Sequence, residues 1–147
     1  YSQKNRQNTS EILIDNSSNW QSIHWKSLES AYKTSPFFEY YEHELVALFN
    51  TKKKSLLAFN LECIEVINSC LTLDIDYSKT INFNKENQEK NYRYLVNARK
   101  ESEIKISPYI QVFQEKHGFI NNLSILDLLF NEGPNAKTYL KTQDLTF

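Results

Sequence analysis

Three consecutive segments of the chain, residues 18–33, 36–50 and 55–71, place apolar residues at helical spacing, and each opens at or next to a serine. A serine hydroxyl can accept a hydrogen bond from a free backbone N–H at the start of a helix. Pro36 lies in the first turn of the second segment, where the missing N–H of proline costs nothing. The pattern therefore predicts three consecutive helices and a chain that is mostly α-helical.

Short segments in which apolar and polar residues alternate predict a minor β component. Alternation is typical of a strand, because successive side chains point to opposite faces of a sheet. The expected fold class is therefore α+β and predominantly α-helical. The expected strands are residues 11–15, 73–77 and 109–113.

The C-terminal part is predicted to form a helical element over residues 124–141. Ser124 and Asp127 resemble a capping box, with Asp in place of Glu or Gln. Residues 79–103 are mostly polar and predict a long loop, either mobile or acting as a lid over a substrate. A chain of 147 residues fits one domain of common size, so we expect a single domain over residues 1–147.

The charge and the cysteines narrow the expected partners and location. A net charge of −1 predicts no broad basic surface for nucleic acid, and the run Lys52-Lys53-Lys54 is interpreted as a solvated turn or an anion contact. No apolar run approaches the ~20 residues of a membrane helix. Cys63 and Cys70 would lie ~10 Å apart on one helix, too far for a disulfide. We expect a small-molecule substrate, no nucleic-acid partner, no transmembrane segment and a cytoplasmic location; the oligomeric state stays open.

Several well-known catalytic and cofactor patterns do not occur in the chain. Its two glycines, Gly118 and Gly133, belong to no GxGxxG or GxxxxGK pattern. The three histidines and two cysteines show no metal-ligand spacing, and no GxSxG motif is present. The sequence therefore predicts no cofactor and no metal site.

The most aromatic stretch, NWQSIHWKSLESAYKTSPFFEYY at residues 19–41, holds seven rings around one histidine. At about 100° per residue, His24 falls ~40° from Trp20, inside an arc with Leu28 and Tyr32. The wheel therefore predicts that His24 points inward. It would then be either a core histidine held by hydrogen bonds or a pocket histidine that acts as acid, base or ligand contact.

Two longer blocks resemble the WbqC-like family. The first is IDNSSNWQSIHWKSLESAYKTSPFFEYY and the second is YIQVFQEKHGFINNLSILDLLFNEGP, so that the resemblance covers roughly residues 11–140. Members of this family begin with a longer N-terminal part, whereas only YSQKNRQNTSEIL precedes Ile14 here. We therefore expect the domain to be incomplete at its N-terminus.

The resemblance implies a function in a bacterial pathway. Some members of the family occur in O-antigen or other surface-polysaccharide gene clusters. The resemblance therefore implies a transferase that attaches glycyl or another small acyl group to a nucleotide-linked amino sugar. The alternative is a non-catalytic sugar- or partner-binding module of the same pathway. In the transferase hypothesis, His24 is the expected catalytic base. The expected substrate-binding residues are Arg6, Asn19, Trp20, Trp25, Tyr32 and Gln111.

Overall fold

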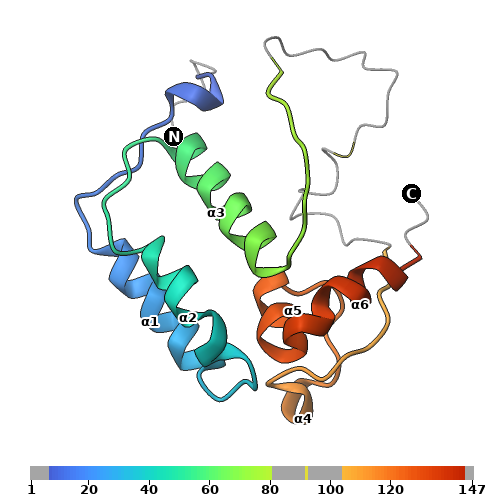
Figure 1. The fold of residues 1–147 in the computed structure, drawn as a ribbon. Coiled ribbons are helices and arrows are strands. Elements are labelled where there is room, and N and C mark those ends of the chain that lie inside the picture. Colours follow the sequence, from blue (N-terminus) through green and yellow to red (C-terminus); the bar gives the residue numbers. More distant parts are fainter. Residues whose placement is uncertain (1–6, 81–91, 93–103, 145–147) are drawn as a thin grey trace.

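The computed structural model describes residues 7–80, 92 and 104–144, and this part of the chain folds into a set of packed helices (Figure 1). No described helix combines the length and the apolar character that a membrane span requires. The main helices are α1 (Trp20–Tyr32), α2 (Phe38–Ala47), α3 (Leu56–Cys70), α4 (Gln114–His117), α5 (Ile125–Glu132) and α6 (Ala136–Thr142), with short 3-10 turns η1 (Thr9–Glu11) and η3 (Gly133–Asn135).

The three predicted N-terminal helices are confirmed, each slightly shorter than expected, but only the last is capped as predicted. Ser55 caps α3, because its Oγ accepts a hydrogen bond from the backbone N–H of Ala58 at 3.3 Å. Asn19 precedes α1 and Phe37 precedes α2, and neither side chain makes a capping hydrogen bond. The predicted C-terminal helical element is also confirmed, as α5, η3 and α6.

The three predicted strands are wrong, since the described residues contain no strand. Within the first segment a single antiparallel bridge joins Leu13 to Ser55. Residues 73–77 and 109–113 form no ladder, and the last of these residues directly precedes α4. Alternation describes which side chains face inward, but a strand also needs a neighbouring strand to accept its hydrogen bonds. The β component of the predicted fold class is therefore absent from the described part.

The core lies where α2 packs against α3 and α5. In Figure 1, α1 and α2 lie side by side, α3 rises next to α2, and α5 and α6 close the space below the C-terminal end of α3. α5 is the most deeply buried element, with four consecutive buried residues from Asp127 to Phe130. The buried apolar residues are Phe38, Tyr41, Leu45, Leu48, Leu71, Tyr109, Leu128, Leu129, Phe130 and Ala136.

Most rings of the aromatic stretch pack against this core instead of forming an open platform. Trp25 lies between Phe38 and Phe49, with ring centroids 6.0 and 5.8 Å apart. Tyr32 and Phe38 both contact Phe130, each at a centroid distance of 5.1 Å. Because aromatic side chains bury large areas, these contacts join α1 and α2 to α5. The high ring content of residues 19–41 is thus explained mainly by folding.

Candidate functional site

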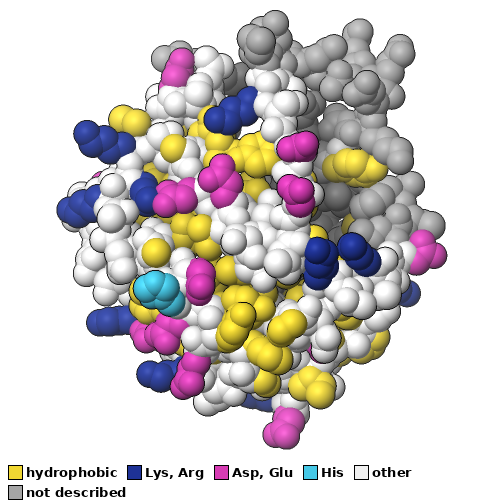
Figure 2. Space-filling view, viewed as in Figure 1, with side chains coloured by type: hydrophobic (Ala, Val, Ile, Leu, Met, Phe, Trp, Pro, Cys, Tyr) yellow, Lys and Arg dark blue, Asp and Glu magenta, His cyan; other side chains and the backbone are white. Residues whose placement is uncertain are grey.

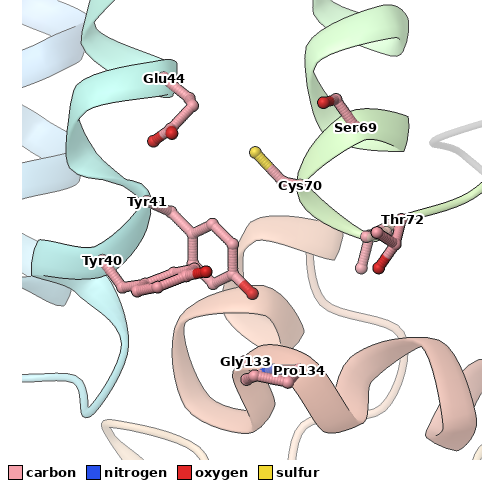
Figure 3. Close-up of a pocket in the computed structure, with 9 residues that line it drawn as sticks. Tyr40, Tyr41, Glu44, Ser69, Cys70, Thr72, Gly133 and Pro134 are labelled. Carbon is pink, nitrogen blue, oxygen red and sulfur yellow. The ribbon is translucent and has the colours of Figure 1, made fainter.

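A pocket of about 220 Å³ opens between α2, the C-terminal end of α3 and the residues that follow α5 (Figure 3). Figure 2 shows hydrophobic side chains gathered on the face where α2 approaches α5, with acidic side chains beside them. Three parts of the chain that are distant in sequence therefore meet at one opening. Its lining consists of Tyr40, Tyr41, Glu44, Ser69, Cys70, Leu71, Thr72, Gly133 and Pro134.

α2 supplies an aromatic ring and a carboxylate to the same edge of the pocket. Residues four apart on a helix are neighbours on its surface, which brings Tyr40 and Glu44 together. Tyr41 turns into the core and is only 4% exposed, whereas Tyr40 is 70% exposed. The two tyrosine rings meet edge to face, with centroids 4.7 Å apart and planes at 84°. Tyr41 therefore supports the ring of Tyr40 and leaves much of it open to solvent beside Glu44.

The wall contributed by α3 ends in a residue with an unusual backbone conformation. Thr72 has a φ of 52°, in the left-handed region that β-branched residues rarely adopt. The N–H of Thr72 donates to the carbonyl of Ser69 and that of Leu73 to the carbonyl of Asn68, which is the helix-ending pattern that usually has glycine at this position. The Nζ of Lys137 donates to the Thr72 carbonyl at 2.5 Å. Strained residues of this kind cluster at functional sites, so Thr72 supports a functional assignment of the pocket.

The opposite wall requires a glycine. Gly133 has a φ of 52° and a ψ of −124°, and a Cβ atom added to it would lie 2.5 Å from the ring of Phe37. The ring and the backbone therefore approach as closely as only glycine permits. The backbone N–H of Phe37 also donates to the carbonyl of Phe130 at 3.0 Å, which anchors this side of the pocket to α5.

The pocket carries one acidic residue, and burial raises the pKa of its thiol and of its buried tyrosine. Of the described residues that line it, Glu44 alone carries a charge. Burial, and secondarily the nearby Glu44, raise the pKa of the Cys70 thiol. Burial likewise raises the pKa of Tyr41, with smaller contributions from Tyr40, Cys70 and Glu44. The pocket therefore offers the carboxyl group of Glu44 beside the protonated thiol of Cys70 and the protonated phenol of Tyr41.

His24 does not point inward, so this part of the sequence prediction is wrong. The side chain is exposed, and its ring lies edge-on to Trp20 at a centroid distance of 5.3 Å. The buried face of α1 is rotated away from His24, because Gln21 is only 6% exposed while Ile23 is 60% exposed. Gln21 tolerates burial by donating its Nε2–H to the carbonyl of Thr51. A wheel that counts glutamine as polar and isoleucine as apolar places the inward arc at the wrong angle.

Two other predicted site residues, Asn19 and Trp25, come together elsewhere. They line a separate pocket of about 330 Å³ with Phe49 and Lys52. Trp20 is half-buried, and its Nε1–H donates to Asn16 Oδ1 at 3.1 Å. This pocket thus brings together an amide, an aromatic ring and one lysine of the basic run.

Gln111 is buried in the C-terminal part of the chain, and Tyr32 is half-buried with its ring against Phe130. The side-chain amide of Gln111 accepts from the backbone N–H of Ile120 and donates to its carbonyl, both at 2.9 Å. The side chain of Gln111 therefore links the segment before α4 to the segment after it. Arg6 lies outside the described residues, as does most of the predicted 79–103 loop. Among the described residues, the predicted site residues do not all line one pocket.

The interior contains a buried carboxylate, Asp127, next to Tyr32 and Tyr109. This group was not predicted from the sequence. Asp127 is 2% exposed, and its Oδ1 accepts a hydrogen bond from the hydroxyl of Tyr109 at 2.8 Å. Burial, followed by the charge of Asp127 and a hydrogen bond to it, raises the pKa of Tyr32 to about 12. Burial, with a smaller contribution from Asp127, raises the pKa of Tyr109 well above its usual range. In the sequence, Asp127 matched a helix-capping position, but Ser124 Oγ accepts from the N–H of Leu126 instead.

Most of the residues around the 220 Å³ pocket carry no signal in the sequence. Tyr40 and Tyr41 are marked only as part of the aromatic stretch, and Cys70 only as a cysteine too far from Cys63 for a disulfide. Nothing local marks Thr72 as left-handed, since threonine normally avoids that region. Among the described residues, no group of three His, Cys, Asp or Glu side chains comes together to hold a metal ion.

Comparison with protein-family models adds one finding about the chain. Residues 1–108 match the model of the WbqC-like protein family. The matched range contains α1, α2 and α3, and therefore the residues Tyr40 to Thr72 that line most of the 220 Å³ pocket. No curated protein and no solved structure matches the chain.

Proposed function

Because the chain belongs to the WbqC-like protein family, we propose that it is a transferase of surface-polysaccharide biosynthesis that attaches a glycyl or another small acyl group to an amino sugar. The resemblance to this family supports the pathway and the reaction type. The observation that supports the acceptor class is the corner formed by Tyr40 and Glu44 at the edge of the pocket (Figure 3). We call it the Tyr40–Glu44 corner.

The Tyr40–Glu44 corner matches the two chemical faces of an amino sugar. The ring of Tyr40 is 70% exposed and can stack on the C–H face of the sugar, as aromatic side chains commonly do with flat apolar surfaces. The carboxylate of Glu44 can accept a charge-assisted hydrogen bond from the sugar ammonium. An ammonium placed there is also attracted to the face of the tyrosine ring. A neutral or N-acetylated sugar would lose the charge-assisted part of the contact with Glu44.

The proposed reaction is a direct transfer between the acyl donor and the amine. Glu44 accepts a proton from the sugar ammonium, and the freed lone pair attacks the carbonyl carbon of an activated glycyl ester or thioester. The new C–N bond forms, and the leaving group departs with the electron pair of the old bond. The amine gives up its second proton to solvent. Because burial and Glu44 raise the pKa of Cys70, its thiol remains protonated and is poorly suited to form an acyl-enzyme.

His24 is the competing candidate for the catalytic base. It was chosen from the sequence because histidine titrates near neutral pH. In the fold it is exposed and is not among the residues that line the Tyr40–Glu44 pocket. We therefore favour Glu44, and comparing the turnover of Glu44→Gln with that of His24→Ala decides between the two residues.

The alternative function is a non-catalytic module that binds a sugar or a partner of the same pathway. A ring beside a carboxylate can hold an amino sugar without transferring anything to it. The two functions differ in the appearance of a product. A reaction mixture of amino sugar, glycyl donor and protein should yield the acylated sugar, detected by its mass, only if the chain is a transferase.

The first experiment measures the melting temperature of the protein against nucleotide-linked amino sugars, their N-acetylated forms, ATP, glycine and acyl-CoA. A ligand that binds only the folded state raises this temperature by mass action. We expect a rise with a free-amine sugar, loss of that rise in Glu44→Gln, and retention in Glu39→Gln. Glu39 is a suitable control because it is exposed on the same helix and does not line the pocket. A flat response to every amino sugar, or an undiminished rise in Glu44→Gln, would contradict the proposal.

A further inference from the structure

The separate pocket of about 330 Å³ that Asn19 and Trp25 line lies between the start of α1 and the end of α2. The two helices run side by side in opposite directions, which brings these two ends together (Figure 1). We call it the α1–α2 pocket. It shares no lining residue with the Tyr40–Glu44 pocket. Its lining consists of Asn19, Gln21, Ser22, Trp25, Val46, Phe49, Asn50 and Lys52.

Lys52 gives the α1–α2 pocket a positive charge. Among the described residues that line the pocket it alone is charged, and none of them is an aspartate or a glutamate. Its neighbour Lys53 forms an ion pair with Glu62 at 2.6 Å, whereas the exposed Lys52 forms none with any described residue. Lys52 is therefore available to attract an anionic ligand.

The start of α1 adds a second positive feature to the same pocket. Asn19 is the N-cap of this helix, yet its side chain makes no capping hydrogen bond, and the first turn contains no acidic residue. Ile23 is the first residue of α1 whose N–H finds a backbone acceptor, the carbonyl of Asn19 at 3.2 Å. The N–H groups that precede it have no acceptor among the described residues, and they form the positive end of the helix dipole.

The side-chain amide of Gln21 is largely buried at this pocket and only partly paired. Gln21 is 6% exposed, and its Nε2 donates one hydrogen to the carbonyl of Thr51 at 3.3 Å. Thr51 stands between the lining residues Asn50 and Lys52, so the amide lies at the pocket wall. In the described part of the chain, Ser35 Oγ is the one inaccessible side-chain atom without a partner, so the unpaired Oε1 of Gln21 is accessible. An amide with this much unused hydrogen-bonding capacity calls for a partner in the pocket.

Trp25 and Phe49 form the carbon-rich wall of the α1–α2 pocket. Both side chains are half-buried, and their ring centroids lie 5.8 Å apart. The indole N–H of Trp20 donates to Asn16 Oδ1, whereas that of Trp25 has no acceptor among the described residues. Trp25 therefore adds a free donor and, together with Phe49, an apolar surface that the carbon skeleton of a ligand can contact.

The end of α2 does not cancel the attraction for an anion. The carbonyls of a helix end would oppose a negative charge, but the three residues that follow α2 each donate their N–H to a carbonyl of its last turn. The next carbonyl along the chain that reaches the pocket, that of Thr51, accepts from Gln21. The pocket thus offers a cation and several free donors, a combination that suits a ligand rich in acceptors and negatively charged.

We propose that the α1–α2 pocket is a second ligand site, which binds a small organic phosphate that bears hydroxyl groups, such as a sugar phosphate. The phosphate accepts from Lys52 Nζ and from the first N–H groups of α1. A ligand hydroxyl donates to Gln21 Oε1, and the carbon skeleton rests against Trp25 and Phe49. The proposal goes beyond the transferase function, and it does not depend on the Tyr40–Glu44 corner, because the two pockets have no residue in common.

The test titrates the isotope-labelled full chain, at constant ionic strength, with glucose 6-phosphate, with glucose and with inorganic phosphate. Glucose lacks the phosphate, and inorganic phosphate lacks the hydroxyl-bearing carbon skeleton. The backbone amide signals of Gln21, Ser22 and Lys52 are followed by NMR. We expect glucose 6-phosphate to shift these signals to saturation, inorganic phosphate to do so with lower affinity, and glucose to leave them unchanged. The proposal is overturned if glucose 6-phosphate gives no saturable shift, or if either of the other compounds binds as tightly.

Two lysine variants separate a defined contact from general charge attraction. Lys52→Gln should weaken the binding of glucose 6-phosphate about tenfold, as expected for loss of one charge-assisted hydrogen bond. Lys54→Gln removes the same charge from the same basic run, but Lys54 is exposed and does not line the pocket, so its affinity should match that of the parent chain. Equal weakening in the two variants would mean that only the overall charge matters, and the proposal would fail.

A third variant tests the start of α1 with two readouts of opposite sign. Asn19→Asp places a negative charge at the N-cap, so it should raise the melting temperature of the free protein and weaken the binding of glucose 6-phosphate about tenfold. Glu44→Gln, in the other pocket, should bind this compound like the parent chain. If Asn19→Asp leaves the affinity unchanged, the helix start does not hold the phosphate and the proposal is wrong.

Discussion

Replacing Gly133 with alanine should be among the most damaging single-methyl additions in this protein. The glycine has a φ of 52° and a ψ of −124°, a backbone conformation that residues with a Cβ rarely adopt. An added Cβ would also lie 2.5, 2.5 and 2.7 Å from three ring carbons of Phe37. The ring cannot retreat freely, because the backbone of Phe37 is tied to Phe130 by a 3.0 Å hydrogen bond.

The expected magnitude has two parts. A strained backbone conformation costs about 1–3 kcal/mol. Forcing a methyl group into a packed contact costs about another 1–3 kcal/mol. The free energy of unfolding should therefore fall by about 2–6 kcal/mol, a large share of the about 5–15 kcal/mol typical of a domain.

The chain contains a matched control for the contact. Gly118 also has a left-handed φ, at 69°, but a Cβ added there would meet nothing within 4 Å. Gly118→Ala should therefore show the backbone cost alone, about 1–3 kcal/mol. Urea unfolding of both variants gives the difference, which measures the clash with Phe37.

A double-mutant cycle tests the assignment of that difference. Phe37→Leu replaces the rigid ring by a smaller and more adaptable side chain, so it should restore part of the stability lost in Gly133→Ala. The reasoning would be refuted if Gly133→Ala were no more destabilising than Gly118→Ala. It would equally fail if Phe37→Leu gave no restoration beyond additivity.

Three further predictions concern the buried carboxylate and the exposed histidine. Tyr109→Phe should lower the free energy of unfolding by about 1.5–3 kcal/mol, because it removes a 2.8 Å hydrogen bond to the buried Asp127. As a control, Tyr77→Phe removes a hydrogen bond to the exposed Glu65 and should lower the free energy of unfolding by less than about 1 kcal/mol. The pKa of Tyr32 in the folded state is raised from 10.0 to about 12, so the unfolded state loses this proton at a lower pH than the folded state does. The urea midpoint should therefore decrease as the pH rises from 10.0 to about 12, and it should decrease less steeply in Tyr32→Phe. Equal slopes in the two proteins would argue against this assignment. His24→Ala should change stability by no more than about 0.5 kcal/mol, since the side chain is exposed, and a larger loss of stability would show that the ring is packed in solution.

The helical part of the fold could be predicted from the sequence because helices are local. Their hydrogen bonds join residues four apart, so spacing and nearby capping residues carry most of the information. α1, α2 and α3 accordingly appear close to the predicted ranges. The expected strands failed because a strand depends on a partner elsewhere in the chain, and Leu13 found only an isolated bridge to Ser55.

The orientation of each helix was less predictable than its extent. For α1, the inward face is set by the elements packed against it, which accept the Gln21 side chain through the carbonyl of Thr51 and leave Ile23 in solvent. A helical wheel contains no information about such partners. The error for His24 follows directly, and the choice of this histidine as a pocket residue depended on it.

The sequence by itself determined that the chain forms consecutive helices with an aromatic core and resembles one family, because these properties depend only on local spacing and residue type. Only the tertiary structure decided which side chains meet at an opening. Tyr40, Cys70 and Gly133 come from three distant segments of the chain. Their proximity results from the packing of α2 against α3 and α5, which depends on the simultaneous burial of many side chains and not on the pattern of any one segment.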